Sequence, residues 1–340
     1  MKVEVCKDPA LWDAYVEACR DAGNYHRWIW KRVIEETFGH AGHYLAAVTD
    51  GTIRGVLPLV EIRSRLFGHF MVSVPFFSHG GVLADTDEAR TSLLAEAEHL
   101  GRELGVRHIE LRQGRDCELG WRSENSKVGM GLPLPSGVEE LLGSLPGKLR
   151  NRIRHSEKQG FELRVGGLEA VGDFYPIFAS NMRHLGTPVY PREWFENICR
   201  SVPDGVRILS AWEGKRVAAG AFLIGFRDRL EVPWSASLPD SRKRYFAMWL
   251  EWKMLEWAVR SGYRWMDLGR STPGSSSYDF KRQWTKHEQP LPWYYWLAPG
   301  VPLPEVRKEN PRYRWATEVW KRLPLGVANW LGPRIVRSIP

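Results

Sequence analysis

Three ionisable residues lie close together in the stretch MDLGRSTPGSSSYDFKRQW, residues 266–284. Asp267, Arg270 and Lys281 bracket a run of Ser, Pro and Gly that is typical of a turn between two elements. An acid beside two cations can hold an anionic group, or stabilise a group that becomes anionic during a reaction. The same pattern also fits a strand, a turn and a second strand whose charged side chains lie in solvent.

Length and composition indicate a globular protein with room for two domains. The chain has 340 residues, 43% hydrophobic and 26% charged, which are ordinary values for a folded protein. Its four cysteines show no CxxC or other metal-ligand spacing, which predicts reduced thiols and no metal site. The first residues lack the apolar core of a signal peptide, and no apolar run is as long as a membrane span. We therefore predict a cytoplasmic protein.

The net charge of +8 is concentrated in two segments. Residues 301–340 contain eight Arg or Lys against three Glu, and residues 148–164 contain six against two. Such patches predict an anionic partner, for example nucleic acid, a phospholipid surface or a phosphate-bearing substrate. In residues 148–160 a helical pattern has a narrow apolar seam at Leu149 and Ile153. Its basic residues are predicted to bind a polyanion, or alternatively to form a solvated helix face; they are Lys148, Arg150, Arg152 and Arg154.

An internal repeat predicts the architecture. The octets GVRHIELR (105–112) and GYRWMDLG (262–269) share the frame Gly-x-Arg-x-apolar-acid-Leu. Each octet follows a helical pattern, at 88–104 in the first half and 245–261 in the second. Further upstream lie two apolar runs around a Gly-containing turn, at 44–62 and 206–226. A matched context on both sides favours duplication of one α/β unit. The second copy is predicted to begin near Ser136.

Several segments resemble the FemAB aminoacyltransferase superfamily, which has tandem GNAT-like domains. The resemblance covers most of residues 10–300, and it is closest to the branch associated with exosortase (PEP-CTERM) exopolysaccharide systems. The segments that carry it are PFFSHGGVLA (75–84), KLRNRIRHSEKQGFEL (148–163), NMRHLGTPVYPREWFENI (181–198) and residues 266–284. The resemblance implies an α/β fold of mixed sheets flanked by helices, with domains at 1–135 and 136–300. A basic, Trp-containing tail follows at 301–340.

The resemblance also implies an activity. Family members that depend on tRNA add an amino acid to an amine of a peptidoglycan precursor, and a Phe-Lys pair beside the reacting ester matches Phe280 and Lys281. We therefore expect an acyltransferase that moves an aminoacyl or acyl group to an amine of a cell-envelope, polysaccharide-precursor or peptide acceptor. The acceptor is expected to be an anionic small molecule or a glycolipid. No permanently bound cofactor is expected, and the co-substrate is aminoacyl-tRNA or acyl-CoA.

Two alternatives remain open at this point. One is an acyl-CoA-dependent GNAT N-acyltransferase, although the segment SRKRYFAMW (241–249) lacks the glycines that usually bind the coenzyme A pyrophosphate. The other is a non-catalytic module that binds an anionic glycan or a lipid assembly. The chain also departs from the branch at Thr285, where a Gly often follows the motif's Trp.

The resemblance suggests catalytic roles within residues 266–284. Lys281 is expected to stabilise the charge that develops on the donor carbonyl oxygen, while Phe280 and Trp284 exclude water. The alternative is that Lys281 lies on a solvated strand face. Asp267 either accepts the proton of the attacking amine or holds Arg270 in place. Because Glu110 occupies the same frame position in the first repeat, a structural role for Asp267 is equally supported.

Further residues are predicted to bind substrate. Hydroxyl and guanidinium groups after Asp267 could bind a phosphate, a helix end in the middle segment could bind an acid, and two histidines in the first half could line an acceptor site. The alternatives are a plain Ser-rich turn, a structural ion pair and structural histidines. These residues are Arg270, Ser271 and Thr272, then Asn181 and Arg183, then His26 and His79.

The tail at residues 312–340 mixes Trp, Leu, Val and Ile with Arg and Lys, and Pro324 and Pro333 interrupt it. It is too short and too charged to cross a bilayer, but it could lie in the interface at the inner face of a membrane. The alternative, slightly favoured, is a helix packed on the second domain with its basic residues outward.

Overall fold

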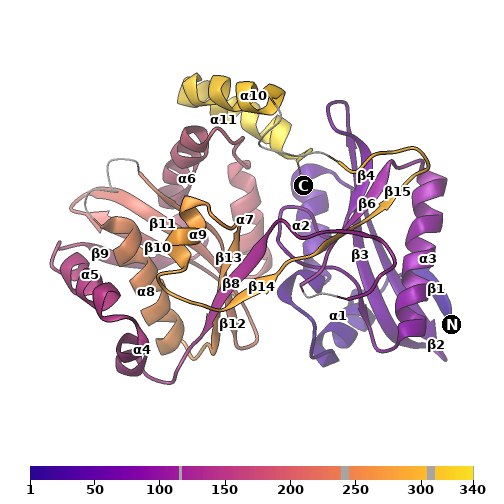
Figure 1. The fold of residues 1–340 in the computed structure, drawn as a ribbon, viewed down its shortest axis with the longest axis horizontal. Helices are drawn as coiled ribbons and strands as arrows, with labels where there is room; N and C mark the ends of the chain where they lie inside the picture. Colours follow the sequence, from indigo (N-terminus) through magenta and orange to yellow (C-terminus); the bar gives the residue numbers. More distant parts are fainter. Residues whose placement is uncertain (115–116, 239–244, 305–310, 340) are drawn as a thin grey trace. The chain divides into compact units, whose positions relative to one another are not determined.

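The computed structural model describes residues 1–114, 117–238, 245–304 and 311–339. The chain divides into two compact units, each a mixed sheet flanked by helices (Figure 1). Unit 1 comprises Met1–Val128, Gln289–Glu305 and Arg337–Pro340, and unit 2 comprises Gly129–Glu288 and Val306–Val336. The predicted fold class, two tandem α/β domains, is confirmed.

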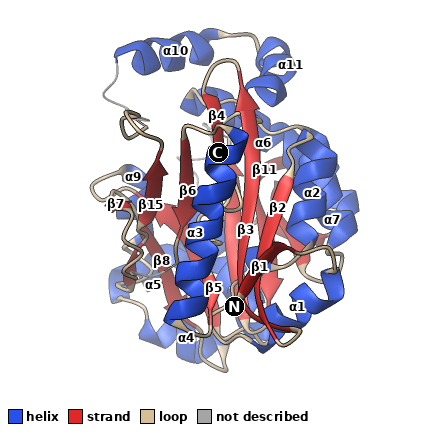
Figure 2. Cartoon of the chain, turned by 90° about the vertical axis from the view of Figure 1, so that its right-hand side faces the viewer, coloured by secondary structure: helices blue, strands red, loops and turns tan. Residues whose placement is uncertain are grey.

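Unit 1 is built on a sheet with the strand order β1-β2-β3-β4-β6-β15-β7, and β5 pairs with β3. Helix α3 lies across this sheet (Figure 2) and buries Leu93 and Ala97 in its core. The elements are β1 (Lys2–Val5), α1 (Pro9–Ala18), η1 (Asn24–His26), α2 (Ile29–Phe38), β2 (Gly42–Thr49), β3 (Thr52–Ser64), β4 (Gly68–Val72), β5 (Leu83–Ala84), α3 (Asp87–Leu104), β6 (His108–Arg112), β7 (Arg122–Glu124) and β15 (Trp293–Leu297).

Unit 2 is built on a sheet with the order β14-β8-β13-β12-β11-β10-β9. Helices α4, α5 and α8 lie together on one side of it (Figure 1) and share a core with the sheet. The elements are β8 (Val128–Pro133), α4 (Val138–Ser144), α5 (Gly147–Glu157), β9 (Glu162–Gly166), η2 (Leu168–Ala170), α6 (Val171–Leu185), α7 (Arg192–Ser201), β10 (Val206–Glu213), β11 (Arg216–Phe226), β12 (Arg229–Ser237), α8 (Phe246–Arg260), β13 (Trp265–Ser271), α9 (Ser276–Lys281), β14 (Glu288–Pro290), α10 (Pro311–Arg322) and α11 (Leu325–Val336).

The predicted repeat corresponds to real structural equivalence. The two octets form the turns and strands that begin at Gly105 and Gly262, whose φ angles are +70° and +83°. Each follows a long helix, α3 or α8, and each strand pairs in parallel with an earlier one, β6 with β4 and β13 with β12. Each half also contains the predicted antiparallel hairpin, β2–β3 and β10–β11. Positive φ at both glycines explains why the frame begins with Gly.

The units differ from the predicted domain ranges, 1–135, 136–300 and 301–340, because strands change sheets. Strand β8 precedes the predicted boundary but belongs to the second sheet, where it pairs next to β13. Strand β15 lies within the predicted second domain, 136–300, but pairs with β6 in the first sheet, for example Tyr295 opposite Glu110. Tyr295 also donates its hydroxyl to Glu110 over 3.0 Å. Chain order alone does not predict such exchanges.

The two C-terminal helices belong to unit 2 and pack against α6 and the loop that follows it. Gly332 on α11 lies so close to Val189 that a Cβ at this position would be 2.9 Å from its backbone nitrogen. The tail therefore has a packed face, as the slightly favoured alternative predicted. Among the described residues, no helix has both the length and the apolar character needed to cross a membrane.

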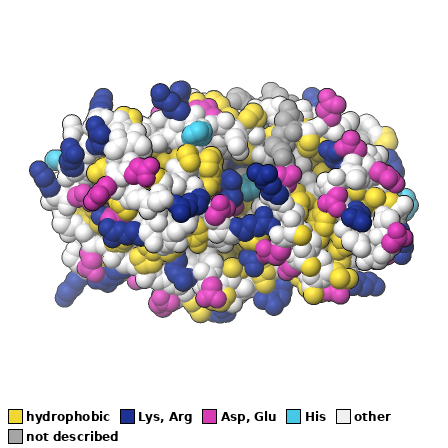
Figure 3. Space-filling view, turned by 90° about the horizontal axis from the view of Figure 1, so that it is seen from below, with side chains coloured by type: hydrophobic (Ala, Val, Ile, Leu, Met, Phe, Trp, Pro, Cys, Tyr) yellow, Lys and Arg dark blue, Asp and Glu magenta, His cyan; other side chains and the backbone are white. Residues whose placement is uncertain are grey.

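The surface charge is mixed on the face drawn in Figure 3. Lys and Arg side chains there are interspersed with Asp and Glu, and they do not form one continuous block. The net charge of +8 therefore does not produce one continuous basic surface on this face.

Candidate active site

The pairing of strands β12 and β13 ends partway along both strands within unit 2. They pair in parallel at Arg229–Trp265, Leu230–Met266 and Glu231–Asp267, and the described residues show no paired positions beyond these. Strand β12 has one extra residue against β11 between Glu231 and Trp234, which is a β-bulge. Pro233 lies within it, and a bulge tolerates the missing N–H of proline. Because a bulge bends and twists its strand, it explains why the regular pairing with β13 ends at Glu231.

Side chains hold the backbone of β13 in place where its pairing with β12 ends. The carboxylate of Asp267 accepts the N–H of Gly269 over 2.6 Å. Gly269 has φ +79°, a conformation that favours glycine. The carbonyl oxygens of Gly269 and Arg270 both accept hydrogen bonds from Nζ of Lys281, each over 3.1 Å. The predicted proximity of Lys281 to Asp267 and Arg270 is therefore confirmed.

Lys281 lies at the end of helix α9, so the strand proposed as its alternative setting is wrong. Ser275 caps this helix, because its hydroxyl oxygen accepts the N–H of Tyr278 over 3.2 Å. Phe280 and Trp284 are four positions apart and meet edge to face, with ring centroids 6.4 Å apart. A Ser cap followed by aromatics at helical spacing was the sequence signal for this helix.

The environment of Lys281 disfavours its charged form. Burial lowers its pKa, the carboxylates of Glu251 and Asp267 act in the opposite direction, and Arg270 lowers it further. Burial in turn raises the pKa of Glu251 to about 7, although Lys281 opposes that shift. A lysine and a glutamate whose pKa values are shifted toward each other are typical of sites that move protons.

Glu251 was missed by the sequence interpretation. It lies on α8, in the segment that was read only as an apolar helix. Met248, Leu255 and Ala258 share its face at helical spacing, and each is buried. An acid on an apolar stripe was the signal that could have identified it.

Other predicted substrate-binding residues organise the turn and the core. Trp284 is buried in the core shared with α8, and its indole N–H has no hydrogen-bond partner within the described residues. Phe280 is partly buried against the same core. The hydroxyl of Ser271 lies 3.4 Å from that of Ser277, and the carbonyl of Thr272 accepts the N–H of Ser275 over 3.0 Å. These contacts support the alternative of a structured Ser-rich turn.

Arg183 and Asn181 lie on α6, apart in sequence from the Lys281 segment. Nη1 of Arg183 donates to the carbonyl oxygens of Leu323 at 3.0 Å and Lys321 at 3.4 Å, which lie at and just after the end of α10. Arg183 therefore satisfies carbonyls at a helix C-terminus. Asn181 is partly buried, and a substrate contact for either residue stays a prediction.

The two histidines belong to unit 1. His26 is buried; its Nδ1 accepts the N–H of Gly23 over 3.0 Å, and its Nε2 donates to the carbonyl of Gly81 over 3.2 Å. These bonds give His26 a structural role. His79 is partly buried and lies edge-on to Tyr25 at 5.3 Å. The structure does not test a role for His79 in binding an acceptor.

The basic helix α5 has the predicted amphipathic form. Leu149 and Ile153 are buried, which confirms the narrow apolar seam. Lys148, Arg152 and Arg154 are exposed. Arg152 donates to the side-chain oxygen of Gln283 over 2.6 Å, which links α5 to the residues after α9. The fourth predicted basic residue, Arg150, is partly buried and donates to the carbonyl oxygen of Gly143 over 3.1 Å.

Thr285, which departs from the resembled branch, has a structural explanation. It is buried, and its hydroxyl donates to the carbonyl of Gly131 on β8 over 2.7 Å. The same hydroxyl accepts the N–H of His287 over 3.0 Å. A glycine could make neither contact, so Thr285 fixes the chain after α9 to the neighbouring strand.

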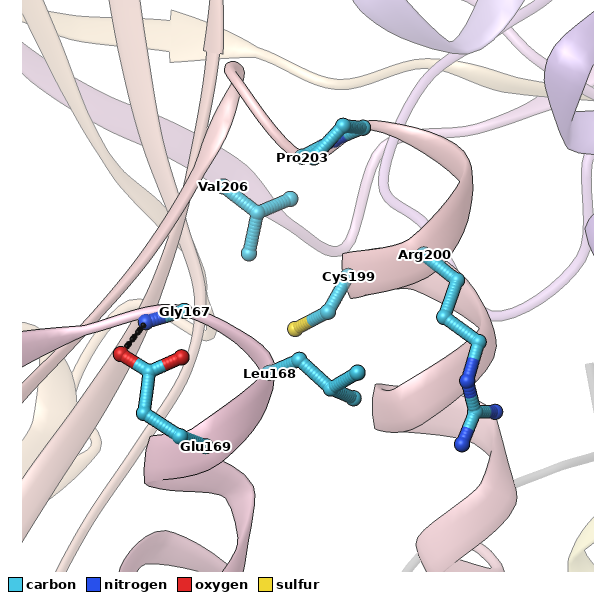
Figure 4. A pocket seen from close by; sticks show the side chains of 7 residues that line it. All are labelled: Gly167, Leu168, Glu169, Cys199, Arg200, Pro203 and Val206. Atoms are coloured by element: carbon cyan, nitrogen blue, oxygen red, sulfur yellow. Dashed lines mark hydrogen bonds between the residues drawn. The ribbon is translucent and has the colours of Figure 1, made fainter.

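A separate pocket in unit 2 is formed by η2, α7 and the start of β10 (Figure 4). The thiol of Cys199 points toward Leu168 in it, and Glu169 accepts the N–H of Gly167 over 2.8 Å. Burial raises the pKa of Cys199 to about 12. A thiol that stays protonated is a poor nucleophile, so this pocket offers no reactive cysteine.

Comparisons with known proteins agree with this geometry. Residues 145–282 match the family model described as Acetyltransferase (GNAT) domain; the matched range runs from α5 to α9 and includes Lys281. The crystal structure of FemX covers 88% of this chain and 98% of its own, with a TM-score of 0.70 and 14% identity. No curated protein sequence matches the chain significantly.

Two further structures share the fold. L-PGS from Bacillus licheniformis covers 93% of this chain and 98% of its own, with a TM-score of 0.56 and 12% identity. A tandem GNAT protein from the clavulanic acid biosynthesis pathway covers 89% of this chain and all of its own, with a TM-score of 0.54 and 13% identity. The chain thus contains a segment that matches a GNAT acetyltransferase domain and shares the fold of these three structures. By class it is an acyltransferase, and GNAT domains typically take their acyl group from acyl-CoA.

Proposed function

We propose that this chain transfers an aminoacyl or acyl group from an activated donor to an amine, with Lys281 beside the reacting carbonyl. The observation that carries the proposal is the position of its ammonium group where the pairing of β12 with β13 ends. Two of its three N–H bonds go to the carbonyls of Gly269 and Arg270. An ammonium has three donors, so one remains for a substrate oxygen, and the other two hold it in place.

In the proposed reaction the amine nitrogen attacks the carbonyl carbon of an ester or thioester. A C–N bond forms, the carbonyl oxygen becomes an oxyanion, and the third N–H of Lys281 stabilises that charge. The oxyanion then re-forms the carbonyl, and the C–O or C–S bond of the donor breaks. The amine proton goes to a base, and the leaving alcohol or thiol takes up a proton.

We assign the base to Glu251 and a positioning role to Asp267. A general base works best when its pKa is near the working pH, and the pKa of Glu251 is raised to about 7. Asp267 has one oxygen occupied by the N–H of Gly269 over 2.6 Å. This contact shapes the turn whose carbonyls hold Lys281, so Asp267 acts through the backbone.

The donor is proposed to be aminoacyl-tRNA, with acyl-CoA as the second candidate. Support for tRNA comes from α5, which presents Lys148, Arg152 and Arg154 to solvent and contacts Gln283 beyond α9. Support for coenzyme A comes from the GNAT family model over residues 145–282. Residues 241–249 contain no glycine; of these, 241–244 lie outside the described residues, and α8 begins at Phe246.

The acceptor is proposed on the resemblance alone. An amine of a cell-envelope, polysaccharide-precursor or peptide molecule would follow from the exosortase-associated branch, and an anionic acceptor would suit the cations Arg270 and Lys281. The decisive test is a donor screen, in which purified protein is incubated with a panel of amines and either charged tRNAs or acyl-CoAs. Formation of an amide from either donor supports transfer; no product from any donor supports a non-catalytic binding module.

Neutralising α5 should weaken tRNA binding without affecting the fold. The variant Lys148→Gln/Arg152→Gln/Arg154→Gln removes exposed charges and leaves Arg150, which caps Gly143. Each lost phosphate contact should flatten the slope of log K against log salt concentration by roughly 0.7–0.9. Filter binding of charged tRNA at several salt concentrations measures this.

A matched control removes equal charge elsewhere, as Lys7→Gln/Arg65→Gln/Lys215→Gln, all exposed positions. The control should bind tRNA like the wild type. Equal losses in both triple variants would mean that the attraction is non-specific. Micromolar binding of acyl-CoA together with no salt-dependent RNA binding would establish coenzyme A as the donor.

A further inference from the structure

Each C-terminal helix presents an exposed stripe of apolar and basic residues. On α10, Trp315 is 71% exposed and Val319 39%, and exposed Arg322 completes the stripe at helical spacing. On α11 the stripe contains Trp330, which is 61% exposed, and the exposed Arg334 one turn later. The opposite faces pack within unit 2, where Ala328 and Gly332 are buried.

Such exposure of tryptophan is unusual in a folded protein, where the indole ring is highly buried on average. The ring of Trp330 is also organised, because the guanidinium of Arg334 lies over it at 4.3 Å. Exposed indole rings beside cations suit the boundary between water and lipid, where the ring meets acyl chains and the cation meets headgroups. Each stripe therefore has the chemistry of a membrane interface.

The charge of this segment has one sign. Residues 311–339 contain Arg or Lys at six positions, and Glu318 is their single acid. Glu318 is itself paired with Lys321 over 2.7 Å. Basic residues near a bilayer are attracted to anionic lipids. The described helices are not membrane-spanning, so a contact parallel to the surface is the geometry that fits.

We propose that α10 and α11 form a docking surface for an anionic lipid bilayer, with Trp315 and Trp330 inserted among the headgroups. A lipid surface fits better than RNA because of the contrast with α5. The exposed positions of α5 are polar or basic, whereas those of α10 and α11 combine basic residues with large apolar ones. The inference goes beyond the proposed transfer and does not depend on it.

The test is co-sedimentation of the full-length protein with vesicles of equal parts phosphatidylcholine and phosphatidylglycerol. Pure phosphatidylcholine vesicles provide the neutral comparison. Point variants are preferable to a deletion, because the tail also carries contacts that hold the fold, such as Arg337 with the carbonyl of Phe38. The wild type should bind anionic vesicles more strongly than neutral ones, and salt should weaken the binding.

Two variants address the two parts of each stripe. Trp315→Ser/Trp330→Ser should weaken vesicle binding by at least roughly tenfold, because less apolar surface enters the interface. Arg314→Gln/Arg322→Gln should weaken it by on the order of tenfold on anionic vesicles alone. Trp315→Phe/Trp330→Phe keeps most of the apolar area and should retain most of the binding.

The matched controls lie in unit 1. Leu66 and Phe67, which are 75% and 44% exposed at the β3–β4 turn, give Leu66→Ser/Phe67→Ser, and this variant should bind like the wild type. Wild-type protein that ignores anionic vesicles would overturn the proposal, as would tail variants that bind unchanged. Self-association that is lost in Trp315→Ser/Trp330→Ser would assign the surface to a second copy, and loss of tRNA binding would assign it to RNA.

Discussion

Replacing Lys281 with methionine should lower the rate of transfer by roughly 10²–10³-fold, the usual effect of removing one donor to an oxyanion. Methionine keeps most of the side-chain volume but cannot donate a hydrogen bond or carry charge. Because the contact is made to charge that develops in the transition state, kcat should fall while KM changes little. Steady-state kinetics with the donor identified by the screen measures both constants.

The same substitution also removes the hydrogen bonds from Lys281 to two backbone carbonyls, and the loss of these bonds should lower stability. The carbonyls of Gly269 and Arg270 lose their shared donor, and an unsatisfied buried carbonyl costs about 1–3 kcal/mol. Burial disfavours the charged lysine, as its lowered pKa indicates, so removing the charge offsets part of this cost. We expect a net loss of about 1 kcal/mol in the free energy of unfolding.

Two further variants separate chemistry from stability. Lys281→Arg keeps the charge and the donors but places them differently, so transfer should still fall by at least about tenfold. Lys253→Met breaks the ion pairs with Glu157 on α5 and Glu256 on α8 and should reduce stability without changing transfer. If Lys281→Met transfers at the wild-type rate, Lys281 serves only to hold the end of β13.

The sequence predicted the fold correctly where turn residues and the internal repeat indicated the same elements. Gly105 and Gly262 start equivalent strands because each adopts a positive φ that other residues avoid. Asp50 and Gly51 likewise form the hairpin turn at φ values of +50° and +73°. A second copy of the same pattern made each assignment more secure, because chance does not preserve both the elements and their order.

The parts that sequence did not predict depend on tertiary contacts. Strand β15 pairs with β6 in the first sheet although its residues lie within the range predicted for the second domain. The candidate site was found in part, because Asp267, Arg270 and Lys281 are close in sequence. Glu251 joins them from α8, fifteen residues or more away, and only folding brings its carboxyl into the field of Lys281.

The carboxyl groups of Asp267 and Glu251 can be distinguished by substitution with amides. Asp267→Asn retains an oxygen that can accept the N–H of Gly269, so the turn should survive and transfer should fall only modestly. Glu251→Gln retains the shape but cannot accept a proton, and should lower transfer by on the order of 10²–10⁴-fold. The reverse ranking of the two variants would make Asp267 the base.

Glu251 should also set the pH dependence of transfer. A base must be deprotonated to act, so kcat/KM of the wild type should rise with pH and level off above about 7, the raised pKa of Glu251. The rise should be missing in Glu251→Gln. Exposed Glu140 on α4 provides the control, since Glu140→Gln should keep the wild-type profile.

The stability of the same variant provides an independent measurement. The pKa of Glu251 is raised on folding from 4.5 to about 7, so the folded state favours the protonated form. Its contribution is fully present below pH 4.5 and is lost as the pH rises through about 7. Glutamine resembles the protonated acid, so Glu251→Gln should be more stable than the wild type at pH 8, by on the order of 3 kcal/mol.

Denaturant unfolding of both proteins between pH 4.5 and pH 8 tests this expectation. The difference in the free energy of unfolding between the two proteins should be small at pH 4.5 and constant above about pH 7. Above that pH, Glu251 is ionised in both the folded and the unfolded wild type. A difference that does not change with pH would mean that the pKa of Glu251 is the same in the folded and unfolded states. In that case it could not be the base with a pKa near neutrality, and the proton of the attacking amine would have to leave by another route.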